Sequence, residues 1–376
     1  MKQDTSTFES KNVKKSSAAK RSFFSNLEIV VTSSCNIRCR HCIYDCQSTS
    51  REKLSKSVIK DLIRQAATLN SFRSVVLTGG EAFLEYETLV ESIALCTDLG
   101  LESSVVTNGF WAQNPHMARQ KLKRLNGLRV LNVSTDSFHQ EFVPVSRIRC
   151  IIESCNDLGI KCVVRFSYLN NPTSELGMLK KQLSGLDSLY KISAMPVAPF
   201  GRAARLIDEF CFYKYDPYGI PCCGADDPVI DSNGDVKVCP GGLFSHLDNS
   251  LLKVGNIFNE TLETIKNSAN RNPIAQVLRL YGPGGLVYLV RKQALKEGVS
   301  FTLPEVEEAK DLCSLCKIII TDPYNSKLLQ RAVKDSEVYR EIAVARFKEF
   351  GEISMLYGNR SILQTDRDAD ILADVI

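Results

Sequence analysis

The chain has 376 residues, of which 44% are hydrophobic and 24% are charged, the balance of an ordinary globular protein long enough for two domains. Its formal net charge is +4, and residues 1–25 carry all of it, with six Lys or Arg residues against two acidic ones. We therefore expect a disordered basic tail over residues 1–25 rather than a nucleic-acid-binding surface. No apolar segment is long enough to span a membrane, and no secretory signal follows the N-terminus, which predicts a cytoplasmic protein without a membrane partner.

After this tail, strand-like and helix-like segments alternate along the first half of the chain. The predicted strands are Leu27–Thr32, Ser74–Leu77, Glu102–Val106, Arg129–Val133, Lys161–Phe166 and Lys191–Val197. The predicted helices, in which apolar residues recur at helical spacing, are Ser57–Leu69, Glu87–Leu99, Pro115–Leu125, Arg147–Leu158 and Ser174–Leu186. Strands separated by helices in this way predict a parallel sheet with right-handed crossovers.

The alternation predicts an α/β fold with an open, partial (β/α)6 TIM-type barrel over residues 26–200, because six units are too few to close an eight-stranded barrel. In such sheets the carboxyl ends of the strands carry the functional site. The polar and cysteine-rich motifs lie at these ends: Cys35 follows the first strand, Gly79–Glu81 the second, Thr107–Gly109 the third and Ser134–Asp136 the fourth.

Three cysteines follow the first predicted strand in the run C-N-I-R-C-R-H-C, as Cys35, Cys39 and Cys42. Three thiolates at this spacing can hold three irons of a cubane cluster and leave the fourth iron open for an exchangeable ligand. Fourteen cysteines in a chain without an export signal also favour metal binding or catalysis over disulfides. The alternative is a zinc site, in which His41 and Cys46 would complete a tetrahedral ligand set.

The run C-x3-C-x2-C, followed at the end of the second strand by T-G-G-E at Thr78–Glu81, resembles the radical S-adenosylmethionine (SAM) superfamily over about residues 27–200. The resemblance implies that Cys35, Cys39 and Cys42 bind a [4Fe-4S] cluster whose open iron chelates SAM. One-electron cleavage of SAM would then give methionine and a 5'-deoxyadenosyl radical that abstracts hydrogen from a substrate. His41 would stand in for the aromatic residue usual at this point and pack beside the cluster.

The resemblance also implies contacts to SAM from other strand ends. Gly79 and Gly80 would let the backbone approach the cofactor, and the Glu81 carboxylate would bind its ammonium group. The remaining contacts implied are Ser134 or Asp136 to the ribose, Arg165 to the carboxylate group, and Asn108 lining the pocket. The alternative is structural, namely a plain Gly-Gly turn and side chains that cap the next helix.

From about Gly201 the alternation of strands and helices stops, and Pro, Gly and Cys become frequent. We expect a C-terminal α+β auxiliary-cluster domain over residues 201–320 and a helical extension over residues 321–376. Within the former, the turn sequence Asp231–Gly234 predicts a β-hairpin.

A second set of cysteines lies in this part of the chain. Cys223 and Cys239 flank a glycine in the pattern C-x10-G-x4-C, and Cys313 and Cys316 follow as C-x2-C. The pattern resembles the SPASM/twitch auxiliary-cluster extension behind many radical SAM domains. It implies one auxiliary [4Fe-4S] cluster on these four cysteines, and a four-cysteine zinc site is the alternative.

Cys222 precedes Cys223 directly, and one cubane does not readily use both thiols. The spare thiol of the pair would be a hydrogen-atom donor to a substrate radical if it faces SAM, as is thought for some peptide epimerases of the superfamily. The alternative is a buried, inert cysteine. Which of the two binds the auxiliary cluster is left open by the spacing.

The resemblance implies an enzyme that abstracts hydrogen from an unactivated C–H bond, with a ribosomally made peptide, crosslinked or epimerised, as the leading substrate class. Only about 26 residues precede the first strand, so leader recognition would need a separate binding protein or another surface of the chain. An electron donor such as flavodoxin or ferredoxin is also expected. His139 and Glu141 are expected beside the active face as substrate contacts or ordinary surface residues. Two alternatives are the same chemistry on a sugar, nucleotide or cofactor precursor, and a non-catalytic iron-sulfur or zinc module.

Overall fold

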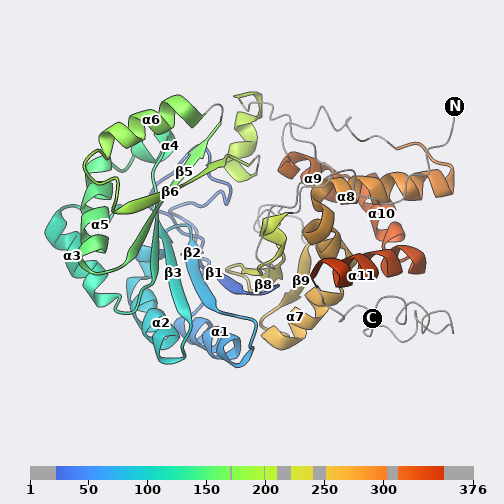
Figure 1. Cartoon of the computed structure of the whole chain (residues 1–376), viewed down its shortest axis with the longest axis horizontal. Helices are drawn as coiled ribbons and strands as arrows, with labels where there is room; N and C mark the ends of the chain where they lie inside the picture. The colour runs from blue at the N-terminus through green and yellow to red at the C-terminus, as the bar shows by residue number, and fades with distance from the viewer. Residues whose placement is uncertain are drawn as a thin grey trace. The chain divides into compact units, whose positions relative to one another are not determined.

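The computed structural model describes residues 23–169, 172–198, 200–209, 222–239, 251–301, 303 and 312–350. Its strands form one sheet in the order β6-β5-β4-β3-β2-β1-β7-β8-β9, and Figure 1 shows helices around the outside of the curved part formed by β1 to β6. Each neighbouring pair among β1 to β6 is parallel. This order confirms the α/β fold and is consistent with the predicted partial barrel.

The strands and helices of this part lie where the sequence predicts them. The strands are β1 (Asn26–Thr32), β2 (Ser74–Gly79), β3 (Glu102–Thr107), β4 (Val130–Ser134), β5 (Lys161–Tyr168) and β6 (Tyr190–Pro196). The helices are α1 (Lys56–Thr68), η1 (Ala82–Glu85), α2 (Tyr86–Asp98), α3 (Pro115–Arg124), α4 (Ser137–Gln140), α5 (Val145–Asp157) and α6 (Pro172–Gln182). The prediction is too long at the end of α6, because the backbone tightens into turns before Gly185, which has a φ of 84°.

The two faces of the parallel strands differ in burial. Residues on the face toward the surrounding helices are fully buried and mostly apolar: Leu27, Ile29, Val75, Leu77, Val105, Leu131, Val133, Cys162 and Val164. The alternate residues form the inner face, and those that are polar and half-buried include Asn26, Glu28, Ser74, Ser104, Asn132, Ser134 and Arg165. They bond to one another, as Asn132 Nδ2 does to Ser104 Oγ at 2.7 Å. The hydrophobic core therefore lies outside the strands, and the inner face is polar.

The predicted hairpin at Asp231–Gly234 is confirmed by antiparallel pairing of β7 (Val229–Ile230) with β8 (Asp235–Lys237). β8 then pairs with β9 (Lys253–Asn256), while β7 pairs in parallel with β1. Asp227, just before β7, accepts hydrogen bonds from the backbone N–H and side-chain amide of Asn26, at 2.8 and 2.6 Å. The hairpin thus extends the barrel sheet at the edge next to β1.

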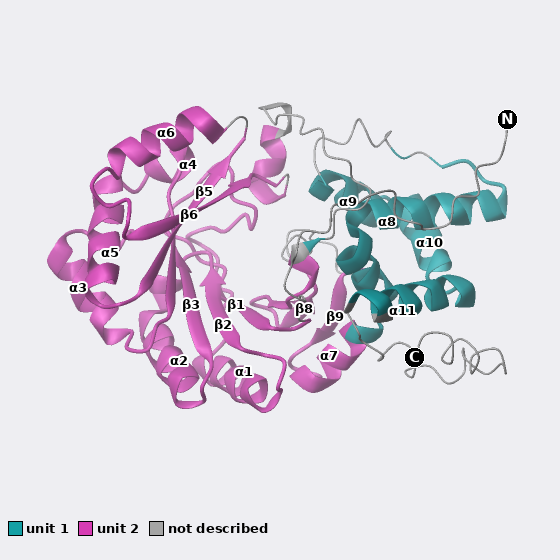
Figure 2. Cartoon of the chain, in the orientation of Figure 1, with its two compact units in different colours: residues 1–22, 214–223, 270–376 teal, residues 23–213, 224–269 magenta. Residues whose placement is uncertain are grey.

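The chain divides into two compact units (Figure 2). We call residues 23–213 and 224–269 the barrel unit, which also holds η2 (Gly201–Glu209), η3 (Cys223–Ala225) in part and most of α7 (Leu262–Arg271). Residues 1–22, 214–223 and 270–376 form the other unit, called the helical unit. The predicted tail over residues 1–25 lies almost entirely outside the described residues, and the predicted boundaries at residues 201 and 321 stay predictions.

In its described part, the helical unit consists of α8 (Pro273–Glu297), α9 (Leu312–Thr321), α10 (Pro323–Ala332) and α11 (Ser336–Phe350). The long helix α8 is buried along most of its length against the other three. It bends at Gly282, whose φ of 64° and ψ of −162° are not helical, before Pro283, which has no N–H to donate. Helices α10 and α11 lie in the segment for which the sequence predicts a helical extension.

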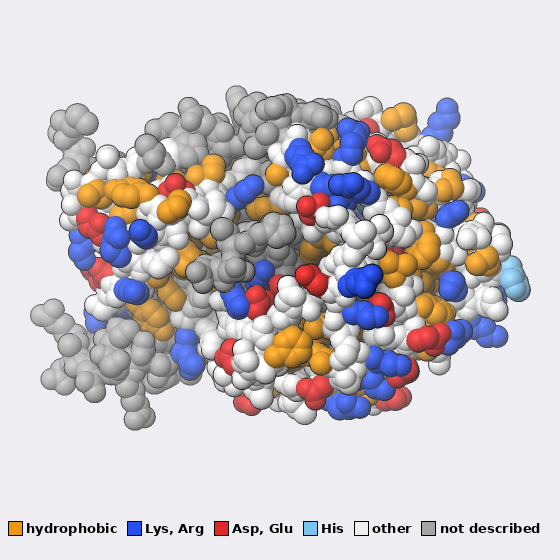
Figure 3. All heavy atoms as spheres, turned by 180° about the vertical axis from the view of Figure 1, so that it is seen from behind, with side chains coloured by type: hydrophobic (Ala, Val, Ile, Leu, Met, Phe, Trp, Pro, Cys, Tyr) orange, Lys and Arg blue, Asp and Glu red, His pale blue; other side chains and the backbone are white. Residues whose placement is uncertain are grey.

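Charged side chains of both signs cover the described surface, and Figure 3 shows Lys and Arg interspersed with Asp and Glu. Some form ion pairs between neighbouring helices, such as Lys56 with Glu91 and Arg124 with Glu87. Exposed pairs of this kind add little to stability. Among the described helices, none combines the length and the apolar character needed to cross a lipid bilayer.

Candidate functional site

The motifs singled out in the sequence meet at the carboxyl edge of β1 to β4, as predicted. We call residues 35–46, in the loop after β1, the cluster loop; Cys35 and Cys39 in it are buried and Cys42 is half-buried. The T-G-G-E segment at the end of β2 is tied to the beginning of the same loop, because Glu81 N donates to Ser34 O at 2.8 Å. Consecutive parallel strands thus bring residues from separate loops to one place.

The two glycines of T-G-G-E allow this close approach. A Cβ atom on Gly80 would lie 2.1 Å from Ser34 O, and one on Gly79 would lie 2.4 Å from Thr32 O. Gly79 also has a φ of 154°, which disfavours any other residue. The glycines therefore hold the second strand against the loop after β1, and the contact to SAM implied by the resemblance stays a prediction.

Glu81 lies at the centre of a buried hydrogen-bond network. One carboxylate oxygen accepts from Thr107 Oγ1 at 2.7 Å and Phe83 N at 3.0 Å, and the other accepts from Asn108 N at 2.7 Å. Burial raises the pKa of Glu81 to about 7, against the opposing effect of these bonds. The side chain thus ties the end of β2 to the end of β3, and its contact to a SAM ammonium group stays a prediction.

Asn108 extends the network to the cluster loop. Its side-chain nitrogen donates to Asn36 Oδ1 at 3.0 Å and lies 3.9 Å from Cys35 Sγ. Its side-chain oxygen accepts from Phe110 N at 3.0 Å. The sequence placed Asn108 at the lining of the pocket, and the structure puts it beside a predicted cluster ligand.

Asp136 binds a histidine. Its carboxylate caps α4 by accepting from Phe138 N and His139 N, both at 3.0 Å, and it lies 2.8 Å from His139 Nδ1. His139 lowers the pKa of this buried carboxyl, although desolvation is the largest single effect and acts in the opposite direction. The resemblance implies a ribose contact for Asp136 or Ser134. Of the two, Asp136 already has several internal partners, while Ser134 is half-buried at the end of β4.

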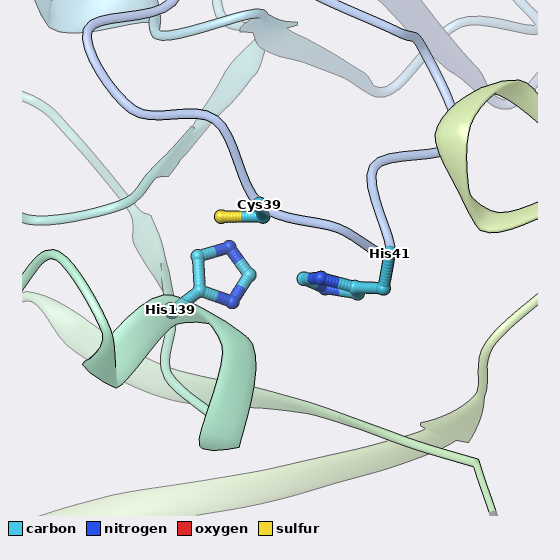
Figure 4. Close-up of side chains that lie close together, drawn as sticks. All are labelled: Cys39, His41 and His139. Carbon is cyan, nitrogen blue, oxygen red and sulfur yellow. The ribbon is translucent and has the colours of Figure 1, made fainter. Parts of the chain in front are cut away.

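His41 packs as an aromatic ring, as predicted. It stacks on Phe138 with ring centroids 4.4 Å apart, and burial lowers its pKa to about 4. Its Nδ1 has no hydrogen-bond partner among the described residues. Figure 4 shows His41 beside His139, with the sulfur of Cys39 over the His139 ring. The packing of the His41 ring is therefore compatible with its predicted place beside a bound cluster.

Only one of the three predicted cluster thiols belongs to a compact group of potential metal ligands. Cys39, His41 and His139 are the described residues with three potential ligand atoms within 4.8 Å of one another. A [4Fe-4S] cluster spreads its thiolate ligands over separate irons, whereas the predicted zinc alternative needs all its ligands around one ion. The assignment of Cys35, Cys39 and Cys42 to the cluster stays a prediction.

The protonation of these thiols depends on their surroundings. Burial raises the pKa of Cys35 to about 11 and also raises that of Cys39. A hydrogen bond from the buried Cys46 lowers the pKa of Cys42 to about 6. Iron binding would thus displace protons from Cys35 and Cys39, which couples cluster assembly to pH.

Arg165 lies on the inner face of β5, near groups to which the sequence did not point. It acts electrostatically on Glu28 of β1 and lowers the pKa of that carboxyl, which burial raises overall. Tyr44 of the cluster loop also hydrogen-bonds Glu28. Sequence reasoning missed Glu28 and Tyr44, because only the curvature of the sheet brings β1 near β5. The predicted contact of Arg165 to the SAM carboxylate stays a prediction.

Arg202 was also missed by sequence reasoning. It follows β6 and is 8% exposed, yet its side chain bonds to the backbone of the cluster loop. Nothing in the local sequence signals this contact, since about 160 residues separate the two segments.

The second set of cysteines is divided between the units. Cys222, Cys313 and Cys316 belong to the helical unit, and Cys239 follows β8 in the barrel unit. Desolvation raises the pKa of the Cys316 thiol, and nearby Cys222 and Cys313 raise it further. The side chain of Cys223 lies outside the described residues. Within the helical unit, the neighbour of the C-x2-C pair is therefore Cys222.

Comparison with known proteins identifies one domain of the chain. Residues 29–170 match the family model described as the radical SAM superfamily. The chain contains a radical SAM domain and is a radical SAM enzyme. The family implies a [4Fe-4S] cluster and SAM, and the buried thiols, the glycine turn and the packed His41 fit both groups. The non-catalytic metal-binding module is thereby set aside.

Relatives of this radical SAM enzyme differ in how much of the chain they match. The putative peptide biosynthesis protein YydG of Bacillus subtilis is 25% identical over 304 residues, 77% of this chain and 90% of that protein. A GTP 3',8-cyclase of Psychromonas ingrahamii is 33% identical over 119 residues, 30% of this chain and 33% of that protein. Streptococcus suis SuiB bound to its precursor peptide SuiA has a TM-score of 0.49 and 17% identity, over 81% of this chain and 73% of that one.

Proposed function

We propose that this radical SAM enzyme abstracts a hydrogen atom from a ribosomally made peptide and so epimerises or crosslinks it. The observation that carries this proposal is the similarity to YydG, a protein named for peptide biosynthesis. That similarity covers 304 residues and thus continues well beyond residues 29–170, which match the superfamily. A relative that matches only the shared catalytic domain supports a substrate class less strongly.

Each part of the site has a place in this function. When bound, a cubane cluster with an open iron supplies the electron that cleaves SAM to methionine and a 5'-deoxyadenosyl radical. Cys35, Cys39 and Cys42 would hold the cluster. Arg165 and Glu28 on the inner face would bind and orient polar groups of SAM or of the peptide backbone. The buried strand ends would keep water from the radical.

We also propose that Cys222, Cys313 and Cys316 hold the auxiliary [4Fe-4S] cluster. The support is the electrostatic effect of Cys222 and Cys313 on the pKa of Cys316 within the helical unit. This choice gives Cys222 the structural task and leaves Cys223 as the candidate hydrogen-atom donor. The contribution of Cys239 stays a prediction from the spacing.

Epimerisation would then remove one hydrogen atom from the peptide and return one to it. The deoxyadenosyl radical removes hydrogen from a Cα atom and becomes 5'-deoxyadenosine, and the Cys223 thiol returns a hydrogen atom from the opposite face. The resulting thiyl radical needs one electron and one proton from an external reductant, such as flavodoxin or ferredoxin. A crosslink would instead remove two hydrogen atoms from the peptide, one taken by the deoxyadenosyl radical and the other lost as a proton and an electron that the auxiliary cluster would accept.

The test is anaerobic turnover of the reconstituted enzyme with SAM, reductant and peptides encoded beside its gene, preferably after coexpression. Epimerisation in D2O should add deuterium at one Cα position, and crosslinking should lower the peptide mass by two hydrogens. A peptide that is unchanged while 5'-deoxyadenosine forms would contradict the peptide proposal. If the enzyme requires a separate leader-binding protein, adding that protein should restore turnover of the peptide.

A second candidate is the same chemistry on a small molecule such as a nucleotide. The identity of 33% to a GTP 3',8-cyclase favours it, but over 119 residues that cover a third of that protein. Adding nucleotides in place of peptides to the same assay separates the two, because only the true substrate should increase 5'-deoxyadenosine formation.

A further inference from the structure

Arg202 stands out because a buried guanidinium contacts the backbone of the cluster loop from a distant segment. Its Nε donates to Cys39 O at 2.9 Å, and its Nη1 donates to Cys46 O at 2.8 Å. Its own backbone N–H donates to Cys42 O, also at 2.9 Å. Arg202 alone therefore donates hydrogen bonds to three backbone carbonyl groups of the cluster loop.

The ion pair of Arg202 fixes the shape of the same loop. Nη1 also lies 2.8 Å from Asp45 Oδ1. Asp45 has a φ of 52°, a left-handed conformation that costs free energy for residues other than glycine. A planar guanidinium with several donors in fixed directions can hold this turn, and an ammonium group at the end of a flexible chain can reach fewer of the acceptors.

Gly201 makes the approach possible. Its φ is 54°, and a Cβ atom there would lie 2.6 Å from Ile43 O and 2.7 Å from Cys42 O. The backbone before Arg202 is therefore packed directly on the cluster loop, and no other residue fits at position 201 without moving that loop.

Arg202 also has an electrostatic effect. Its guanidinium charge lies at the backbone oxygens of Cys39 and Cys46, within the loop that carries the three thiols. A permanent positive charge near the sulfur atoms also favours the form of a cluster that carries one more electron.

We infer that Arg202 is a positioning residue for the SAM-binding cluster. It holds the cluster loop in the conformation in which its cysteines can bind the cluster, and its charge raises the reduction potential of the cluster. The inference rests on the proposed assignment of that cluster to Cys35, Cys39 and Cys42. It does not depend on the identity of the substrate.

The experiment compares Arg202→Gln, Arg202→Lys and Asp45→Asn in the full-length, anaerobically reconstituted protein. Arg149→Gln is the matched control, because Arg149 donates to two backbone carbonyls, of Gln182 and Ser184, on the surface away from the cluster loop. Iron and sulfide content, the midpoint potential of the cluster and its EPR spectrum with and without SAM are measured. The variant with Cys35, Cys39 and Cys42 all changed to Ala gives the iron content without this cluster.

Arg202→Gln should lose most of the iron above that baseline, and any cluster that remains should have a more negative potential. Arg202→Lys should recover the potential, because it keeps the charge, but should still lose iron faster than wild type. Asp45→Asn should also release iron faster, and Arg149→Gln should match wild type. These readouts do not depend on turnover.

Wild-type iron content and potential in Arg202→Gln would overturn the inference. If that variant does not fold, Arg202→Lys and Asp45→Asn decide, and wild-type iron retention in both would also overturn it. Failure of the cluster assignment is recognised separately, because wild-type protein would then show no iron above the triple-Ala baseline, and failure of the proposed peptide substrate would leave all these readouts unchanged.

Discussion

The two sets of cysteines in this chain are built in different ways. The first set lies in one loop of twelve residues, inside the barrel unit, and is surrounded by Gly80, Asn108 and Arg202. In the second set, Cys313 and Cys316 belong to the helical unit, where their neighbour is Cys222 from a separate segment. The spacing of ligands within one loop follows directly from the sequence. The spacing of the ligands in the second set depends instead on how distant segments fold together.

This contrast predicts different consequences of losing each set, and the largest concerns the cluster loop. Changing Cys35, Cys39 and Cys42 together to Ala should abolish 5'-deoxyadenosine formation, because no iron remains to bind SAM. Iron bound by the second set should remain. Chromatography of the reaction and iron analysis measure both.

Cys150→Ala is the control for that experiment, since Cys150 is a half-buried cysteine on α5, outside both sets. It should keep wild-type iron content and SAM cleavage. Residual SAM cleavage in the triple variant would contradict the assignment of the cluster to this loop.

The second set should show a smaller and separable effect. Cys316→Ala should lose the auxiliary iron but still cleave SAM without substrate turnover, because the cluster loop belongs to the other unit. Cys222→Ala should behave in the same way if Cys222 is a ligand. Cys223→Ala should instead keep the auxiliary iron but no longer return a hydrogen atom to the peptide radical.

Iron analysis with Mössbauer or EPR spectroscopy distinguishes these variants. Iron loss in Cys223→Ala together with full iron in Cys222→Ala would reverse the assignment of the neighbouring pair. Full iron in all three variants would contradict an auxiliary cluster on this set.

A third prediction concerns the packing that surrounds the cluster loop. Gly80→Ala places a methyl group where the backbone oxygen of Ser34 now lies, so the T-G-G-E turn or the loop must move. We expect a loss of about 3 kcal/mol in stability and weaker iron binding. Thermal unfolding of the cluster-free protein and iron content measure the two effects.

Gly177→Ala is the matched control, because nothing lies within 4 Å of a Cβ atom at this position inside α6. Alanine there should leave iron content unchanged and add about 0.5–1 kcal/mol of stability. Equal behaviour of the two variants would show that the turn does not constrain the cluster loop.

The sequence predicted much of the barrel and of the cluster loop, because both depend on local patterns. Alternating apolar segments fix the strands and helices, and C-x3-C-x2-C fixes three ligands within a single loop. The Gly-Gly turn was likewise visible as a sequence that tolerates close backbone approach, and Gly80 does pack on Ser34.

Contacts between distant segments were the part that the sequence did not predict. Arg202 and Glu28 gain their partners only when the sheet curves and brings β6 and β5 to the cluster loop and β1. Ser134 or Asp136 was expected to contact a ribose, which stays a prediction, and the sequence does not show that the His139 ring lies within hydrogen-bond distance of Asp136. The pairing of β7 with β1 was missed for the same reason, since two-residue strands carry no pattern of their own.

A fourth prediction concerns the buried network that joins β2 to β3. Burial raises the pKa of Glu81 from its ordinary value of 4.5 to about 7 in the folded protein. Below pH 4.5 the carboxyl is protonated in both the folded and the unfolded state, and the stabilising effect of the folded-state proton is fully present. As the pH rises toward 7, the unfolded state releases its proton first, so wild type should lose about 3 kcal/mol of its free energy of unfolding.

Glu81→Gln has no proton to release, so the stability of the cluster-free variant should vary less with pH than that of wild type over this range. The absolute stability of the variant should be lower near pH 4.5, because an amide nitrogen replaces one of the oxygens that accept from Asn108 N or Thr107 Oγ1. Denaturant unfolding at several pH values measures both. Parallel pH profiles for the two proteins would show that Glu81 ionises in the folded state as it does in the unfolded chain, and that the network at the end of β2 is open to water.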